Sequence, residues 1–213
     1  MKTLNFQTLF MAFAALLLIG LGTPRFLASI WMAVGDPIYQ DIGSGTAVSE
    51  DDVRALIESR KTALSLVDLP RAATDLGTAY VQQETSPEAI ERAIQSIKSG
   101  LEMAPVSAFA WLRLASLQAT DPNQQSEAVA AWETARKLAE HEPFLLHARI
   151  QVGITLYGPM NDVQRELLRT DVETAYRQSR SSLYTFGKNN NLLEWFKFLL
   201  RDEEKTKFLN RQP

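Results

Sequence analysis

The chain contains no cysteine. This absence excludes disulfide bonds, thiolate metal ligands and cysteine nucleophiles together. It does not decide the compartment, because exported and cytosolic proteins can both lack cysteine. Histidine is almost absent too, since His141 and His147 are the only two and lie six residues apart. A helical zinc site places its histidines four residues apart on one face, so we predict no metal site.

Sequence motifs of known chemistry are also missing. There is no G-x-S-x-G, no P-loop and no G-x-G-x-x-G, and the glycines at Gly43 and Gly45 belong to a run too short to cradle a phosphate. The carboxylates of Glu203 and Glu204 belong to a charged tail and are typical of a solvated surface. We therefore predict that the protein is not an enzyme and uses no cofactor.

Net charge is small, at −3, which is too little to attract nucleic acid by bulk electrostatics. The sign is nevertheless uneven along the chain. Acids outnumber bases by about two to one from Asp36 to Glu102, and the reverse holds from Arg177 onward. This division fits either an ordinary solvated surface or docking in one orientation. The partners we expect are other proteins, with no role for nucleic acid.

One long apolar run opens the chain. Leu9 to Gly22 is unbroken over about 14 residues, and Phe6 to Thr23 reaches about 18, the lower limit for crossing a bilayer. Trp31 and Arg25 follow it and are typical of a membrane interface. We predict that residues 1–34 form a retained signal anchor or transmembrane segment.

The alternative for this segment is a secretory signal peptide. Gly20-Leu21-Gly22 offers small residues at the spacing of a cleavage site, although it lacks the preferred alanines. Positive charge is nearly balanced across the span, with Lys2 before it and Arg25 after it. A short tail ahead of a first span usually stays inside. We therefore predict a single-pass inner-membrane protein with a cytoplasmic N-terminus and a periplasmic soluble domain.

The rest of the chain reads as a linker and a helical domain. Glycine, proline and serine recur from Gly35 to Val48, so we predict a flexible linker over residues 35–48 and a helical domain over residues 49–213. Ser49 with Asp52 is a capping-box pattern, and Ser86-Pro87 is a second start signal. Caps and prolines place the helices at about residues 49–66, 70–83, 86–103, 107–120, 121–140, 143–157 and 163–179.

Near the C-terminus, Asn189–Asn191 predicts a break. The strongly apolar segment Leu192–Leu200 that follows is too short to span a bilayer. We expect it to cover the end of the helical stack. The alternative is a helix that binds a membrane surface or a partner.

An internal repeat connects two of the predicted helix pairs. Trp111, Leu114 and Ala115 are followed by Ala128-x3-Trp132 and then Pro143, and Pro105 lies 38 residues before that proline. The pattern resembles the tetratricopeptide repeat, which has W-x2-L-G-x2-Y, A-x3-F and a proline over 34 residues. The resemblance covers about residues 71–157. It implies a stack of antiparallel helix pairs with a helical C-terminal cap, in which small residues allow close packing.

A second, weaker resemblance extends over the whole chain. An N-terminal anchor, a few such repeats and a helical end with arginines and aromatic residues resemble the small tetratricopeptide-like proteins of bacterial exopolysaccharide and O-antigen loci. The segment from Glu142 to Arg211 carries this likeness. It implies a role in polysaccharide assembly or export at the envelope.

Repeats of this type imply a concave binding surface made by first helices. We predict that the partner groove is lined by Phe109, Leu112, Arg113, Ser116, His147 and Ile150. Arg113 and Arg149 could supply anchoring charges for a carboxylate or a backbone. Alternatively, these residues pack against the terminal helices and leave no groove.

Three functional hypotheses follow. The first is a membrane-anchored scaffold or adaptor that gathers proteins at the bacterial envelope. The second is a small structural subunit of a larger membrane complex. The third is an exported accessory or substrate-binding protein, which would follow from a cleaved N-terminus.

Overall fold

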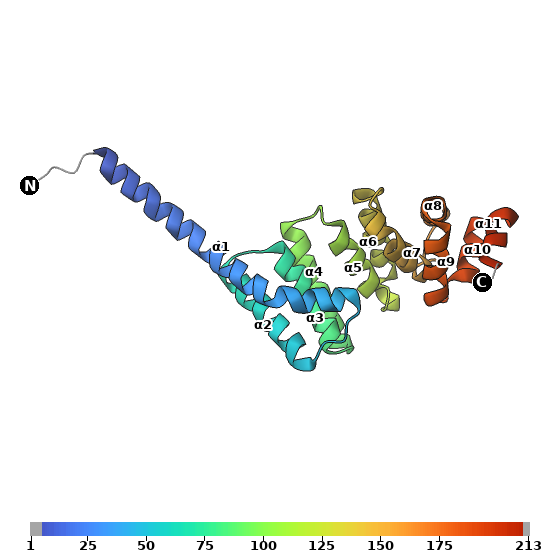
Figure 1. Ribbon diagram of the computed structural model, residues 1–213, viewed down its shortest axis with the longest axis horizontal. Helices are drawn as coiled ribbons and strands as arrows, with labels where there is room; N and C mark the ends of the chain where they lie inside the picture. Colours follow the sequence, from blue (N-terminus) through green and yellow to red (C-terminus); the bar gives the residue numbers. More distant parts are fainter. Residues whose placement is uncertain (1–5, 211–213) are drawn as a thin grey trace, which may run out of the picture. The chain divides into compact units, whose positions relative to one another are not determined.

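The computed structural model describes residues 6–210, and every regular element in this range is a helix (Figure 1). The predicted all-helical class is therefore confirmed for the described residues. The chain divides into two compact units, one ending at Pro105 and the other beginning at Val106. This division differs from the predicted boundary at residue 49. We call them unit 1 and unit 2 and describe each by itself.

The described part of unit 1 contains α1 (Phe6–Ser44), α2 (Glu50–Leu66), α3 (Pro70–Gln83) and α4 (Pro87–Met103). Local signals set where these helices begin. The Ser49 hydroxyl accepts a hydrogen bond from the backbone N–H of Asp52, whose carboxylate accepts one from the Ser49 N–H, so the predicted capping box is confirmed. The Ser86 hydroxyl accepts a hydrogen bond from the backbone N–H of Ala89 and so caps α4, whose first residue is Pro87.

The predicted linker over residues 35–48 is wrong for most of its length. α1 continues to Ser44, and only residues 45–49 connect it to α2. Tertiary packing explains the difference, because the apolar side chains of this segment lie on the buried core of α2 and α3. The residues in contact are Ile38, Tyr39 and Ile42 on one side and Val53, Leu56, Ile57, Leu76 and Ala79 on the other. Their burial outweighs the low helix propensity of glycine and proline.

A buried ionic cluster reinforces this packing. Arg60 of α2 is fully buried, and its guanidinium lies 2.7 Å from the Asp36 carboxylate of α1 and 3.2 Å from the Asp75 carboxylate of α3. The same guanidinium donates a hydrogen bond of 2.8 Å to the Met32 carbonyl. Arg71 adds a second contact to Asp36, at 2.8 Å. The C-terminal half of α1 is therefore an integral part of unit 1.

The N-terminal half of α1 is different, because its large apolar side chains from Leu9 to Leu21 are exposed. The segment Leu9–Ser44 is long and apolar enough to cross a membrane, and none of its most apolar window is buried. The prediction of an apolar N-terminal helix suited to a transmembrane segment or signal anchor is thus confirmed. A signal sequence has the same properties, so retention and orientation stay predictions.

Unit 2 begins with α5 (Ala108–Gln118), a short 3-10 helix η1 (Pro122–Gln124), α6 (Gln125–Leu138), α7 (Pro143–Thr155) and α8 (Asp162–Gln178). α5 packs on α6 and α7, and α8 packs on α7. Trp132 lies in the core, fully buried, and its indole N–H donates a 2.8 Å hydrogen bond to the Arg149 carbonyl. Gly153 lies beside this indole, where a Cβ would come within 3.2 Å of the ring. Whether these helices form tetratricopeptide repeats stays a prediction.

The C-terminal part of unit 2 contains α9 (Arg180–Asn189), α10 (Leu193–Leu200) and α11 (Glu203–Asn210). The predicted break at Asn189–Asn191 is confirmed, and Asn191 adopts a left-handed conformation with φ 57°. α10 packs on α8 and α9 through buried Phe196, Leu199 and Leu200. Much of the apolar surface of α10 is thus buried inside unit 2.

A candidate protein-binding groove

A groove lies between α5 and α7 in unit 2, with a volume of about 430 Å³. Four of the predicted partner residues line it: Phe109, Leu112, Arg113 and Ser116. They lie at positions i, i+3, i+4 and i+7 of α5, which is the spacing of a single helix face. Leu112 is buried in the floor, while Phe109 is 58% exposed. The structure therefore brings the α5 half of the predicted site together.

The α7 side of the groove has a different composition from the predicted one. Its lining residues there are Phe144, Leu145, Ala148, Gln151, Val152 and Thr155. Phe144 was missed, although its side chain is 88% exposed and is the most exposed large apolar side chain described. The available signal was its place directly after Pro143, since a proline at the first helical position puts Phe144 in the first turn of α7.

His147 and Ile150 do not line this groove. Ile150 is fully buried. The His147 ring stacks on Phe186 of α9, with ring centres 4.5 Å apart and planes inclined by 7°. Burial lowers the pKa of His147 because it disfavours the charged imidazolium. The predicted α7 face was rotated by about one residue, since α7 is apolar around most of its circumference and its pattern does not identify one face.

Arg149 is not the exposed anchor that the sequence suggested. Its side chain is 1% exposed and lies 2.6 Å from the carboxylate of Asp171 in α8. The Arg136 guanidinium of α6 approaches the same carboxylate at 3.2 Å. Arg149 also donates a hydrogen bond of 2.7 Å to the Ala139 carbonyl. This cluster joins α6, α7 and α8 behind the groove and leaves Arg113 as the one charged side chain among the described lining residues.

The chemistry of the groove suits binding of apolar side chains. Its floor is aliphatic, and Phe109 and Phe144 stand exposed at its sides. Ser116, Gln151 and Thr155 supply neutral donors and acceptors at the surface. Pockets with apolar floors and a few polar groups are typical of sites that bind side chains of a partner.

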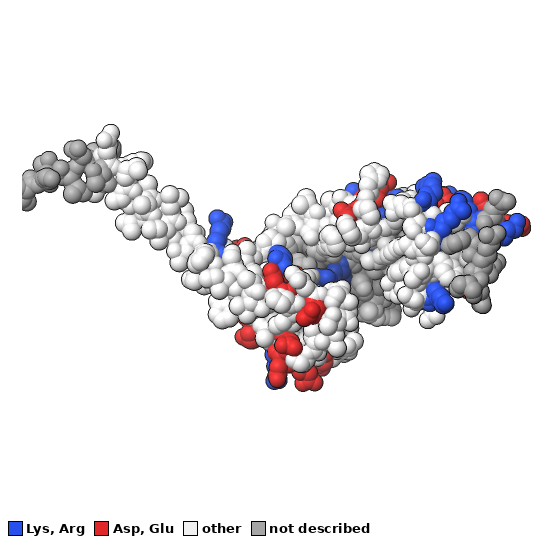
Figure 2. Space-filling view, in the orientation of Figure 1, with Lys and Arg blue, Asp and Glu red and all other residues white. Residues whose placement is uncertain are grey.

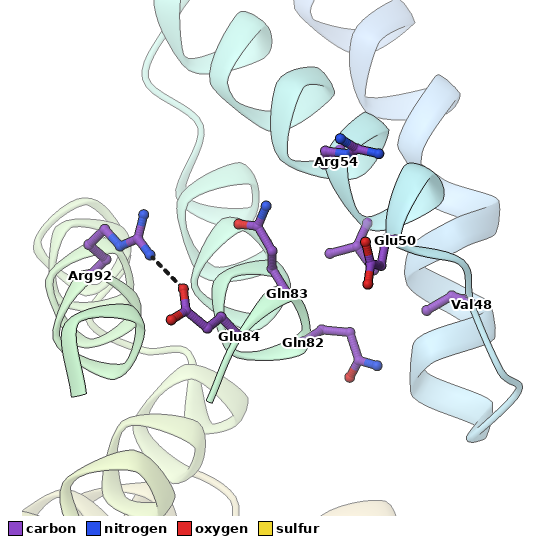
Figure 3. Close-up of a pocket in the computed structure, with 8 residues that line it drawn as sticks. Val48, Glu50, Arg54, Gln82, Gln83, Glu84 and Arg92 are labelled. Atoms are coloured by element: carbon purple, nitrogen blue, oxygen red, sulfur yellow. Dashed lines mark ion pairs between the residues drawn. The ribbon is translucent and has the colours of Figure 1, made fainter. Parts of the chain in front are cut away.

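Unit 1 contains a second cavity, of about 530 Å³, with a polar lining (Figure 3). Glu50 and Arg54 come from α2, Gln82 and Gln83 from the end of α3, and Arg92 from α4. Its two arginines contact acidic side chains of the same chain. Arg92 lies 3.9 Å from the Glu84 carboxylate and 5.2 Å from the centre of the Tyr80 ring, while Arg54 pairs with Asp51. Both cations of this cavity therefore have an acidic partner within the chain.

An aromatic group stands at the surface of unit 2, where α10 meets the segment after α7. Trp195 and Phe198 lie 5.2 Å and 5.7 Å from the ring centre of Tyr157. The guanidinium carbon of Arg165 lies 4.9 Å from the centre of the Tyr157 ring. The three rings contact one another directly, so the cluster is a packed edge with one exposed member, Phe198 at 52%.

Within residues 6–210, no three metal-binding side chains come close enough together to hold an ion. Comparison of the chain with models of protein families finds no match. Comparison with curated proteins finds no match either.

Proposed function

We propose that this protein is a membrane-anchored scaffold or adaptor that binds a segment of another protein in the groove between α5 and α7. The observation that carries the proposal is the exposure of Phe109 and Phe144 on either side of a concave apolar surface. Exposed aromatic side chains beside a pocket are typical anchors for a partner. The order of α5, α6, α7 and α8, with contacts between successive helices, supports the tetratricopeptide-like arrangement on which the groove prediction was based.

The proposed occupant is a short apolar segment of a partner protein. The groove volume of about 430 Å³ accommodates a few side chains, which fits a peptide segment better than a large folded surface. The lining residues carry one positive charge, on Arg113.

The proposed location is the inner membrane, with the N-terminus in the cytoplasm and both units in the periplasm. The exposed apolar side chains of α1 support the anchor. The proposed setting is polysaccharide assembly or export, which rests on the resemblance of the whole chain and on no structural observation.

A second candidate is a small structural subunit of a larger membrane complex. The observation that favours it is again α1, whose exposed side chains could pack against transmembrane helices of other subunits. In this alternative the partners contact α1, whereas in the adaptor proposal the partner contacts the groove.

Site-specific photocrosslinking in native membranes tests both. A photoreactive phenylalanine is placed at Phe144, at Leu17 in α1, and at Val163, which is 70% exposed and outside the groove lining. The adaptor proposal predicts one defined adduct from position 144 and none from position 163. A second substitution, Ala148→Trp, fills the groove from an exposed position and should abolish that adduct.

Two outcomes would contradict the adaptor proposal. The first is the same adducts from positions 144 and 163, because these would reflect random collisions. The second is an adduct from position 144 that persists in the Ala148→Trp variant. Stoichiometric adducts from position 17 alone would instead support the subunit alternative.

A further inference from the structure

The segment of α1 that follows Arg25 has two opposite apolar faces. Ala28 and Met32 face unit 1 and are buried. On the other side, five large apolar side chains are 41–66% exposed, and we call them the outer apolar face: Phe26, Leu27, Ile30, Trp31 and Val34. At 3.6 residues per turn, these five positions share one side of the helix, roughly opposite to Ala28 and Met32. An apolar surface of this kind on an otherwise folded unit marks a contact with something outside it.

The length of α1 indicates that this face contacts the lipid bilayer. From Leu9 to Val34 the helix rises about 38 Å, which is 25 steps of about 1.5 Å. A bilayer measures about 30 Å across its hydrocarbon core and about 40–45 Å with its headgroups. A span of about 20 residues that begins at Phe6 ends at Arg25. The outer apolar face therefore comes directly after the hydrocarbon core, at headgroup depth, where tryptophan and arginine are favoured.

The other helices of unit 1 are attached to α1 at this same level. Ala28 and Met32 pack against Ala63 of α2 and Ala72 of α3. Apolar residues of the last turn of α2 and of the connection to α3 surround this contact: Leu64, Leu66, Val67 and Leu69. The end of unit 1 that lies nearest to Arg25 is thus mainly apolar, with one exposed carboxylate in the connection, Asp68.

The charges of unit 1 fit the same orientation. The acidic first turn of α2, Glu50–Asp52, follows the end of α1, about 24 Å along the helix from Ala28. Acidic side chains gather over that end of unit 1, and a basic side chain stands where α1 leaves it (Figure 2). The acidic end, with three carboxylates in one turn, would be repelled by anionic lipid more strongly than the apolar end, whose connection exposes Asp68 alone.

We propose that unit 1 docks on the bilayer surface through the outer apolar face and the connection between α2 and α3. This inference rests on the proposed membrane anchor. The Arg60–Asp36 contact holds α1 on unit 1, and no flexible linker separates them. The bilayer therefore sets the orientation of unit 1 relative to the membrane, with its acidic end pointing away from the lipid.

The absence of cysteine allows a direct test, because a single introduced cysteine takes one label. The full chain is reconstituted in vesicles of phosphatidylethanolamine and phosphatidylglycerol, with a polarity-sensitive fluorophore at one position. Leu27→Cys and Ile30→Cys report the outer apolar face, Leu17→Cys reports the span, and Ser44→Cys is the control at the far end of α1. All four native side chains are exposed, so the fold should tolerate the change, which circular dichroism verifies.

Iodide in the buffer and nitroxide-labelled lipids serve as quenchers. We expect labels at positions 27 and 30 to be quenched most by a nitroxide near the headgroup, with blue-shifted emission and iodide quenching several-fold weaker than at position 44. The label at position 17 should respond to a nitroxide deep in the acyl chain.

Three outcomes would overturn the proposal. If iodide quenches positions 27 and 30 as strongly as position 44 while position 17 responds to the deep nitroxide, the anchor stands and the docking fails. If iodide also quenches position 17, the proposed anchor itself fails. If positions 27 and 30 resist both iodide and lipid quenchers, protein covers this face, and a second copy replaces lipid as its partner.

Discussion

Gly35 of α1 offers a test whose sign distinguishes a packed helix from a flexible linker. A Cβ at this position would lie 2.7 Å from the Arg60 guanidinium and 2.9 Å from the Leu56 side chain, with the Ser59 hydroxyl closer still. None of these groups moves freely. Arg60 is held by Asp36 and the Met32 carbonyl, and Ser59 donates a hydrogen bond to the Leu56 carbonyl.

The expected magnitude combines two opposing effects. Replacing glycine by alanine inside a helix stabilises it by about 1 kcal/mol. Overpacking in a closed contact costs about 1–3 kcal/mol, and the upper end applies because Arg60 must shift with its ion pairs. We expect Gly35→Ala to lower the free energy of unfolding of unit 1 by about 2 kcal/mol. A linker residue would show the opposite sign, since alanine reduces the entropy of the unfolded chain.

Hydrogen exchange with mass spectrometry across a urea series measures this effect. Peptides report unit 1 and unit 2 separately, which a single global probe does not. The matched control is Gly43→Ala, also within α1, where an added Cβ meets nothing within 4 Å. A neutral or stabilising effect of Gly35→Ala on unit 1 would refute the packing of α1 on α2 and restore the flexible linker.

Three further predictions concern single contacts. Asp171→Asn leaves buried Arg149 without its counter-charge and should destabilise unit 2 by about 3–5 kcal/mol in the same urea series, while Asp162→Asn, at a fully exposed carboxylate, should cost far less. Ser49→Ala removes the cap of α2 and should lower the free energy of unfolding of unit 1 by about 1 kcal/mol, measured by the same method. An unchanged free energy of unfolding would show that the capping box does not stabilise unit 1. The folded pKa of His147 is lowered by burial, so the unfolded state binds the proton more readily and the stability of unit 2 should fall as pH drops below about 6.5. His147→Phe keeps a ring against Phe186 and should flatten that dependence in urea midpoints at different pH; an unchanged slope would exclude His147 as its source.

Helix starts were predictable from sequence because their signals are local. Ser49 and Ser86 each bond to a backbone N–H three residues later, so a few letters contain the whole interaction. The start of α8 uses the same device at Asn161 with Gln164, which places it at Asp162. The predicted start of this helix, at Val163, differs by one residue from the observed start, because the capping role of Asn161 was not recognised.

The misplaced features depend on distant parts of the chain. Gly35 and Pro37 indicate a linker when read locally, but α2 and α3 supply the surface that makes them helical. Arg149 looks like a free anchoring charge until Asp171 of α8 is placed against it. The α7 face of the groove was missed for a related reason. Where most side chains of a helix are apolar, only the neighbouring helices decide which of them stay exposed, as Phe144 does.

Arg60 and Arg149, the two fully buried arginines among the described residues, share a feature that bears on function. Arg60 donates to the Met32 carbonyl of α1, and Arg149 donates to the Ala139 carbonyl at the end of α6. Buried ion pairs contribute little net stability compared with apolar packing, because desolvation offsets their attraction. Their directional bonds instead restrict how one helix can slide on another. Arg60 thereby fixes the proposed membrane helix on unit 1, and Arg149 fixes the back of the helix that presents Phe144. A binding groove held in place before its partner arrives loses less entropy on binding, so the Arg149 cluster would favour binding in the proposed groove by fixing its geometry.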